Sequence, residues 1–266
     1  MEKYEDKIQA NKMAWSKLSK DHYETYKACL AKDDFELNPM VEAELGDISG
    51  KRILHLQCNT GADSILLARK GAYVTGVDLV EENIFYAKKL AEDFQMTNVN
   101  FIESDVLKLS DVHQGEYDIV LTTDGVIGWI PDLNQWGKVI SSFLKSDGFF
   151  YLHDGHPFMM IFDEEDLSKG ILNPRYPYFQ MTADKEMTIG GYASSPKDAE
   201  NYYWGHQMST IINGLASNGL YITYIKEYDR CVDGMGGSAR DENGLCYYPE
   251  LEGKLPLVFS LKAVKK

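Results

Sequence analysis

The chain alternates short apolar runs with longer segments in which apolar residues recur at helical spacing. Apolar runs bounded by turn residues are typical of strands buried in a parallel sheet, whereas repeats of three to four residues are typical of amphipathic helices. This pattern predicts strands at residues 52–56, 73–77, 99–103, 117–122, 149–153, 220–227 and 257–263. It predicts helices at residues 62–70, 81–94, 133–145 and 206–217, and further helices within residues 1–50. Strands that alternate with helices of this length indicate an α/β fold, a doubly wound and mostly parallel sheet with helices on both faces.

Two parts of the chain depart from this alternation. The last two predicted strands are joined by a loop and no helix, so they should pair antiparallel. Residues 155–204 contain prolines and many aromatic residues but no clear periodicity, which is typical of functional or disordered segments. So many aromatic residues favour order, and the segment follows the fifth strand, at the edge where doubly wound sheets bind ligands. We therefore predict an inserted substrate lid at 155–204 and a helical cover at 1–50, both within a single domain of residues 1–266.

The segment KRILHLQCNTGADSILLARKGAYVTGVD predicts a strand, a tight turn, a helix and a second strand that ends on a carboxylate. Thr60 or Asn59 is placed to cap the helix, and Gly71 is placed to end it. Asp78 lies at the tip of the second strand, about 20 residues beyond the turn, where a carboxylate can accept both ribose hydroxyls of a nucleoside. The alternative is local, because Asp78 and Glu81 have the spacing of a capping box.

The turn is poor in glycine, which narrows the choice of nucleoside. A dinucleotide site needs closely spaced glycines, so that the backbone can approach a pyrophosphate at a helix N-terminus. Here Gly61 is the available glycine, and Gln57 and Asn59 occupy positions where a dinucleotide site requires no side chain. A pyrophosphate would fit poorly, whereas S-adenosylmethionine contains none.

These residues resemble those of a known family, the class I S-adenosylmethionine-dependent methyltransferases. The motifs that carry the resemblance run through nearly the whole chain: GKRILHLQC, ESDV, YDIVLTTDGVIGWIPDL, LKSDGFFYLHDGHP, YYWGHQMSTIINGL and LPLVFSLKAVKK. More narrowly, HLQC in place of the usual acidic, glycine-rich first motif resembles a bacterial branch of small-molecule type. The resemblance implies a Rossmann-like sheet of seven strands with the last strand antiparallel, and S-adenosylmethionine as the cofactor.

The resemblance also implies roles for single residues. Asp105 would accept a hydrogen bond from the adenine amino group, with the amide of Val106 reading the ring, unless Asp105 is only a turn residue. Leu79 and Val80 would form the apolar wall of the adenine slot, unless both belong to the core. Asp124 would either meet the ammonium of the methionine part or order its own loop. The implied cofactor-binding residues are Gln57, Cys58, Asn59, Gly61, Asp78, Leu79, Asp105, Val106, Thr123 and Asp124.

His153, Asp154 and His156 form a dense cluster of titratable side chains after a predicted strand end. A base or substrate-orienting role for His153 and His156 is one hypothesis, since an amine or hydroxyl acceptor must lose a proton around the time of methyl transfer. The alternative is a structural role. No metal is predicted, because the cluster has no further ligand-type partner near it in the sequence.

Composition excludes several classes of partner. The net charge of −14 opposes the counterion release that drives nucleic-acid binding, and it also repels an anionic membrane surface. The four cysteines lack metal-type pair spacing, and no N-terminal apolar stretch resembles a signal peptide. These features predict reduced thiols in a cytoplasmic protein that binds neither nucleic acid nor membranes.

The predicted function is an S-adenosylmethionine-dependent methyltransferase that acts on a small-molecule acceptor by direct displacement. Such a reaction depends mainly on alignment and desolvation of the reactants, so the sequence does not identify the acceptor. Two alternatives remain at this stage: a non-catalytic S-adenosylmethionine-binding protein, and an NAD(P)-dependent oxidoreductase. The oligomeric state is left open.

Overall fold

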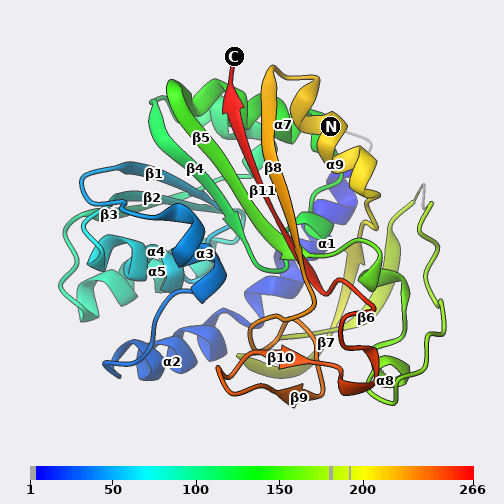
Figure 1. Cartoon of the computed structure of the whole chain (residues 1–266). Coiled ribbons are helices and arrows are strands. Elements are labelled where there is room, and N and C mark those ends of the chain that lie inside the picture. The colour runs from blue at the N-terminus through cyan, green and yellow to red at the C-terminus, as the bar shows by residue number, and fades with distance from the viewer. Residues whose placement is uncertain (1–3, 180–181, 192) are drawn as a thin grey trace.

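A computed structural model describes residues 4–179, 182–191 and 193–266. In this described part, seven strands form one sheet in the order β3-β2-β1-β4-β5-β11-β8 (Figure 1). β11 pairs antiparallel with both β5 and β8, and the remaining pairings are parallel. The predicted doubly wound sheet with a reversed last strand is therefore confirmed. The strands are β1 Arg52–Leu56, β2 Tyr73–Asp78, β3 Val99–Glu103, β4 Tyr117–Thr123, β5 Leu144–Gly155, β8 Leu220–Tyr228 and β11 Val258–Lys265.

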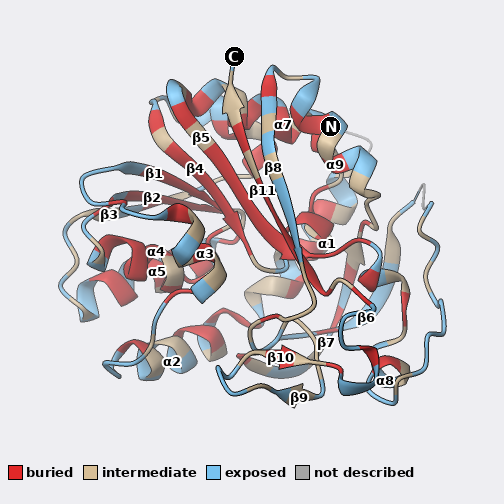
Figure 2. Cartoon of the chain, viewed as in Figure 1, coloured by how far each residue is buried: buried red, intermediate tan, exposed pale blue. Residues whose placement is uncertain are grey.

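Helices cover both faces of the sheet, so the central strands are buried on both sides (Figure 2). On one face, Trp136 and Phe150 lie in a core that includes residues of α7 and α9. On the other face, Ile65 and Tyr151 lie in a core built with α2, α3, α4 and α5. The helices are α1 Glu5–Ser16, α2 Ser19–Leu30, α3 Pro39–Leu45, α4 Ala62–Arg69, α5 Glu81–Asp93, α6 Leu109–Val112, α7 Leu133–Phe143 and α9 Met208–Ala216.

The strand order reverses between β1 and β4. From β1 the sheet runs through β2 to β3 in one direction, and from β4 it runs to β5 in the other. In open α/β sheets this reversal leaves a crevice at the carboxyl ends of the two strands, where ligands bind. The fold thus predicts a site beside the turn that follows β1 and the loop that follows β4.

The turn before α4 differs from its prediction. The N-cap of α4 is Gly61, which has a φ of 81°, and no side chain caps the helix. The Asn59 side chain accepts a hydrogen bond from the amide of Thr60, at 2.6 Å, and so is used within the turn. The predicted cap by Thr60 or Asn59 is therefore wrong. A glycine is required instead, because a Cβ at Gly61 would lie 2.7 Å from the Phe101 ring. Gly71 follows the last turn of the helix with a φ of 88°, as predicted.

Residues 155–204 are more regular than their sequence predicted. They contain the short helix α8 (Glu164–Leu167) and a hairpin of β6 (Asp184–Gly191) and β7 (Ser194–Tyr203). Residues 180–181 and 192 of this segment lie outside the described part. β7 packs against α1, where the Asn11 side chain exchanges two hydrogen bonds, of 2.8 and 2.7 Å, with the backbone of Tyr202. The hairpin therefore supports the N-terminal helices.

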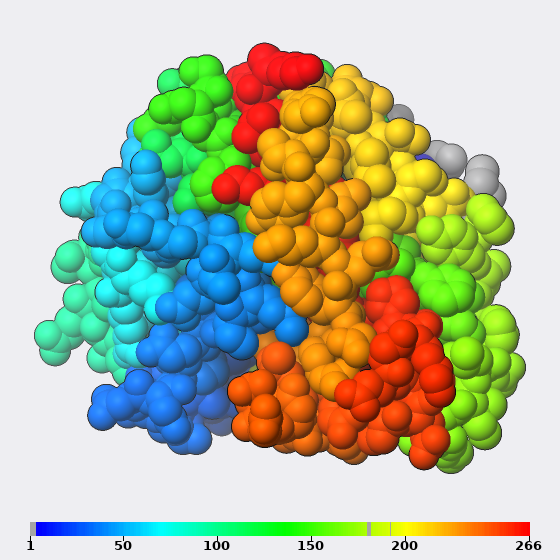
Figure 3. All heavy atoms as spheres, viewed as in Figure 1, coloured from blue at the N-terminus to red at the C-terminus, as the bar shows by residue number. Residues whose placement is uncertain are grey.

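A second segment outside the alternation connects β8 to β11. It contains the two-residue strands β9 (Ala239–Arg240) and β10 (Cys246–Tyr247), which pair antiparallel. In Figure 3 this connection (orange to red) lies beside the N-terminal helices (blue) on the surface of the molecule. Among the described residues, no helix combines the length and the apolarity needed to cross a bilayer.

Candidate functional site

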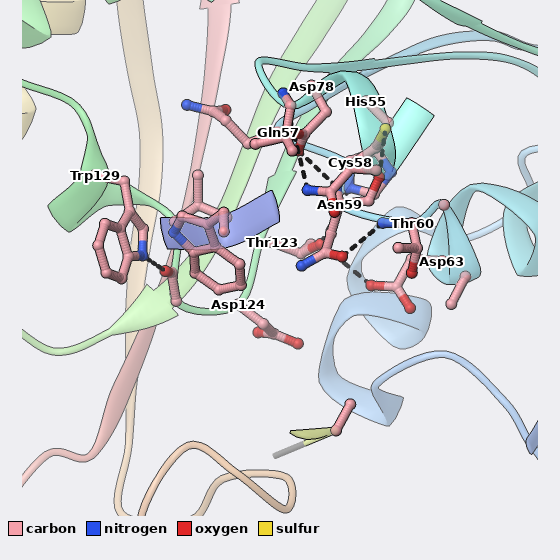
Figure 4. Close-up of a pocket in the computed structure, with 18 of the residues that line it drawn as sticks. His55, Gln57, Cys58, Asn59, Thr60, Asp63, Asp78, Thr123, Asp124 and Trp129 are labelled. Atoms are coloured by element: carbon pink, nitrogen blue, oxygen red, sulfur yellow. Dashed lines mark hydrogen bonds between the residues drawn. The ribbon is translucent and has the colours of Figure 1, made fainter. Parts of the chain in front are cut away.

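A cavity of about 530 Å³ lies at the carboxyl ends of the parallel strands (Figure 4), at the position that the strand order predicts. This volume is within the range of small-molecule sites. One wall, which we call the strand-end side, comes from the segments that follow β1 to β4. The opposite wall, the cover side, comes from α1, α2, the segment before α3 and residues 232–235 of the β8–β11 connection. All ten predicted cofactor-binding residues line the cavity: Gln57, Cys58, Asn59, Gly61, Asp78, Leu79, Asp105, Val106, Thr123 and Asp124.

Three of the residues that line the cavity have a strained backbone. Gln57, Asn59 and Asp124 have φ values of 51°, 52° and 53°, in the left-handed region that side chains with a Cβ rarely adopt. Among the described residues, one further non-glycine residue, Gln95, has a positive φ, and it does not line the cavity. Such conformations cost roughly 1 to 3 kcal/mol each and persist where surrounding contacts hold them, typically at functional sites.

Asp78 provides the contacts that hold the turn after β1. Its Oδ2 accepts a hydrogen bond from the amide of Asn59 at 2.9 Å, while its Oδ1 accepts from the amide of Val80 and from the Asn83 side chain, both at 3.0 Å. Burial raises the pKa of Asp78, and these hydrogen bonds oppose that rise. Asp78 does not form the capping box, because the N-cap of α5 is Val80. A carboxylate oxygen can accept two hydrogen bonds, so Oδ2 keeps an open acceptor position.

Asp105 is arranged in a similar way after β3. Its Oδ1 accepts a hydrogen bond from the amide of Leu107 at 2.9 Å. Its Oδ2 is buried and has no hydrogen-bond partner in the described part of the chain. Burial raises the pKa of Asp105, because the charged form loses its contact with water. An unpartnered carboxylate oxygen at a cavity wall is an acceptor for a ligand donor.

A polar chain connects β1, β4 and α4 beneath the cavity. The Thr123 hydroxyl lies 3.5 Å from both His55 Nε2 and Asp63 Oδ2, and His55 Nδ1 lies 2.8 Å from the Ser64 hydroxyl. Burial lowers the pKa of His55 to about 4, so this ring is neutral at physiological pH. Burial, and then the nearby Asp124 carboxylate, raise the pKa of Asp63 to about 7. Asp63 therefore exchanges a proton near neutral pH, a property that the sequence analysis missed.

The two histidines proposed as bases do not line the cavity. Nε2 of His156 lies 2.9 Å from the Glu227 carboxylate, and its Nδ1 accepts a hydrogen bond from the amide of Phe158. His153 is fully buried, with Nδ1 2.5 Å from Asp124 Oδ1. Their positions do not support direct proton abstraction from an acceptor, because neither side chain forms part of the cavity wall. His153 instead orients Asp124, which does line the cavity.

The cover side contains the residues that sequence reasoning missed. The sequence predicted that residues 1–50 cover the pocket, and these residues do line it, but no single side chain was singled out. Within the described part of the inserted segment 155–204, only Ala193 lines the cavity. Residues 232–235 carried no signal, because their contact with the N-terminal helices joins segments about 200 positions apart. The cover side includes Asn11, Trp15, Tyr26, Phe35, Asn38, Asp233 and Met235.

Comparison with known proteins agrees with this geometry. Residues 47–202 match the model of the methyltransferase domain family. A ubiquinone biosynthesis O-methyltransferase of Acinetobacter baylyi is 28% identical over 117 residues, which is 42% of this chain and 49% of that protein. The chain thus spans about half the length of the curated relatives it matches.

Solved structures share the fold at low identity. A structure of a putative S-adenosylmethionine-dependent methyltransferase from Listeria monocytogenes has a TM-score of 0.59 at 21% identity, covering 85% of this chain and 96% of that one. A geranyl diphosphate C-methyltransferase from Streptomyces coelicolor, solved with S-adenosyl-L-homocysteine, has a TM-score of 0.52 at 12% identity and covers 82% and 71%. With a family match over more than half of its length, the chain belongs to the methyltransferase domain family, the class I S-adenosylmethionine-dependent enzymes that its motifs resemble.

Proposed function

We propose that the protein binds S-adenosylmethionine on the strand-end side of the cavity and methylates a small molecule held against the cover side. The observation that carries this proposal is the pair Asp78 and Asp105. Both carboxylates line the cavity, both are fixed by backbone amides, and each keeps an open acceptor position.

The polar atoms of the wall fit the cofactor. Asp105 Oδ2 suits the adenine amino group, and the open position of Asp78 Oδ2 suits a ribose hydroxyl. The Oγ1 of Thr60 and the Oε1 of Gln57 are also buried without a hydrogen-bond partner among the described residues. A buried polar atom without a partner costs about 1 to 3 kcal/mol, so this wall favours a ligand that supplies donors.

When bound, the cofactor supplies an electrophilic methyl group: an acceptor lone pair bonds to the methyl carbon while the carbon–sulfur bond breaks and its electron pair stays on sulfur. The residues of this chain then have three tasks. The strand-end side holds the donor, the cover side excludes water, and the two together align the acceptor. None of these tasks requires a nucleophilic side chain.

A small acceptor is supported by the size of the cavity and by its cover. The Acinetobacter relative is described by its name as an O-methyltransferase of ubiquinone biosynthesis, but its matched region is only part of either chain. We therefore carry over the small size of the acceptor and not its identity. The expectation of a cytoplasmic protein is kept, with Cys29, Cys58, Cys231 and Cys246 all free thiols.

Thermal unfolding with added ligand tests the proposal. S-adenosyl-L-homocysteine at 100 times its Kd should stabilise the folded protein by about 2.7 kcal/mol, because it binds the folded state alone. S-adenosylmethionine should act similarly, whereas NAD should produce no shift. No shift with either sulfur compound at millimolar concentration would overturn the proposed function.

A further inference from the structure

The cavity has a pronounced charge asymmetry that the cofactor alone does not explain. Among the described residues, its lining includes six carboxylates and no lysine or arginine. Two of the six form salt bridges with cations outside the lining, with Lys70 at 3.2 Å from Glu36 and Arg240 at 2.8 Å from Asp233. The lining carboxylates are Glu36, Asp63, Asp78, Asp105, Asp124 and Asp233.

Asp63 and Asp124 are the two lining carboxylates that have neither a lysine or arginine partner among the described residues nor a proposed contact with the nucleoside. Asp78 and Asp105 are held by backbone amides, and their open oxygens suit the nucleoside. Asp63 and Asp124 have no lysine or arginine within salt-bridge distance in the described part of the chain, and they lie close enough that the Asp124 charge raises the pKa of Asp63. The positive groups of the cofactor offset one of these two charges, in keeping with the suggested contact between Asp124 and the cofactor ammonium. The other carboxylate attracts a cation on the acceptor.

Aromatic rings line the same cavity. Trp15 and Trp129 meet edge to face with 5.2 Å between ring centroids, and Tyr26 and Phe35 are 6.4 Å apart. His22 joins the two pairs, 5.9 Å from Trp15 and 6.1 Å from Tyr26. We call Trp129, Trp15, Tyr26 and Phe35 the aromatic row, and all four line the cavity. Ring faces attract cations, most strongly when the cation is an alkylated ammonium shielded from water. The lining carboxylates and the aromatic row therefore favour the same ligand chemistry, that of a cation.

Resting on the proposed function, we infer that the methyl acceptor is an amine, bound as its ammonium between the aromatic row and the Asp63 carboxylate. Before transfer, the ammonium gives one proton to the Asp63 carboxylate, which leaves a neutral amine with a free lone pair and a neutral carboxylic acid. The nitrogen lone pair would then bond to the methyl carbon as the carbon–sulfur bond breaks, with the electron pair of that bond staying on sulfur and the methylated nitrogen leaving as an ammonium. Repulsion from Asp63 and Asp124, neither of which has a lysine or arginine within salt-bridge distance in the described part of the chain, disfavours an anionic acceptor at this position.

Binding of a fixed cation tests this inference without turnover. The full chain is first titrated with S-adenosyl-L-homocysteine, and the loaded protein is then titrated calorimetrically with benzyltrimethylammonium or with phenylacetate. We expect the cation to bind and the anion not to bind. Trp15→Leu and Trp129→Leu should weaken cation binding by roughly 3- to 30-fold, while both variants still bind S-adenosyl-L-homocysteine. Phe85→Leu, an exposed aromatic outside the cavity, is the matched control and should bind like the wild type.

Turnover gives the second measurement. Formation of S-adenosyl-L-homocysteine from S-adenosylmethionine should be stimulated by benzylamine and by other small primary and secondary amines, and not by benzyl alcohol or phenylacetate. Failure of S-adenosyl-L-homocysteine to bind at all would overturn the proposed function and this inference with it. Two results would overturn the amine inference alone, provided that the cofactor binds normally. One is that phenylacetate binds as tightly as benzyltrimethylammonium or more tightly. The other is that the two tryptophan variants and the Phe85 control bind the cation with the same affinity.

Discussion

The two sides of the cavity are built in different ways. The strand-end side comes from about 75 consecutive residues, in which each turn follows a strand tip and is fixed by hydrogen bonds within that stretch, such as that from the Asn59 amide to Asp78. The cover side joins segments that are far apart in the chain, for instance through the contact between Asn11 and Tyr202. In the proposed function the cofactor binds the strand-end side and the acceptor the cover side, so the first side would hold what the family shares and the second what is particular to this chain.

The largest effect on methyl transfer is expected at Asp63. Its carboxylate belongs to the strand-end side, and we propose that it takes a proton from the acceptor held against the cover side. Asp63→Asn should lower methyl transfer to an amine by roughly 10² to 10⁴-fold, since a positioned base contributes on that scale. The wild-type rate should rise with pH through about 7, as Asp63 loses its proton, and the variant should lack that rise. Pre-steady-state rates between pH 5.5 and 8.5 provide the measurement. The neighbouring groups are Asp124 and Thr123 of the β4 end and His55 of β1, and His55 stays neutral throughout this range.

The same substitution should change stability in the opposite direction. The folded protein holds the Asp63 proton more strongly than the unfolded chain, because the pKa is about 7 against a reference of 3.8. The stabilising contribution is therefore complete below pH 3.8 and is lost as the pH rises to 7. Asp63→Asn should raise the free energy of unfolding at pH 8 by on the order of 1 to 3 kcal/mol. If Asp63→Asn is less stable than the wild type at pH 8, the Asp63 carboxylate stabilises the fold, and its burial as a charged group is not a cost kept for function.

The second prediction concerns Asp78, which combines a structural and a ligand-binding role. Asp78→Ala should weaken S-adenosyl-L-homocysteine binding by roughly 10- to 150-fold and lower the free energy of unfolding by about 1 to 3 kcal/mol, since it also leaves the amides of Asn59 and Val80 without an acceptor. Calorimetry and urea unfolding separate the two effects. Glu103→Ala is the matched control. Glu103 ends the neighbouring strand β3 in register with Asp78, but it pairs with Lys12 at the surface and does not line the cavity. If both variants lose the same affinity for S-adenosyl-L-homocysteine, Asp78 does not contact the ligand specifically.

The two sides of the cavity also differ in how far the sequence could predict them. Asp78 and Gly61 could be chosen because a strand tip and a turn are local patterns, and Asp105 because the resemblance to the family implies its role; all three line the cavity. Asp63 could not, because its perturbed pKa arises from burial and from Asp124, about 60 positions away. The histidines were chosen for their chemistry, yet their orientation is set by pairing with Glu227 and Asp124, which the sequence does not encode locally.

The smallest effect on cofactor affinity and methyl transfer is expected for substitutions in the inserted segment 155–204. They test whether this segment belongs to the cover side. The segment was predicted to be the substrate lid, but the Tyr178 hydroxyl accepts a hydrogen bond from the Met208 amide and Phe179 is 76% exposed. Neither residue lines the cavity, so replacing both with alanine should change cofactor affinity and methyl transfer by less than about twofold, as for ordinary surface substitutions.

Met235→Ala provides the contrast to this double variant, because Met235 lines the cavity from the β8–β11 connection. It should leave S-adenosyl-L-homocysteine affinity nearly unchanged but raise the KM for the acceptor several-fold, because the acceptor loses an apolar contact while the strand-end side stays intact. Steady-state kinetics on both variants decide which segment covers the acceptor. If the double variant loses methyl transfer and Met235→Ala does not, the inserted segment must close over the cavity once the ligands are bound. The segment around Tyr178 and Phe179, and not the β8–β11 connection, would then cover the acceptor.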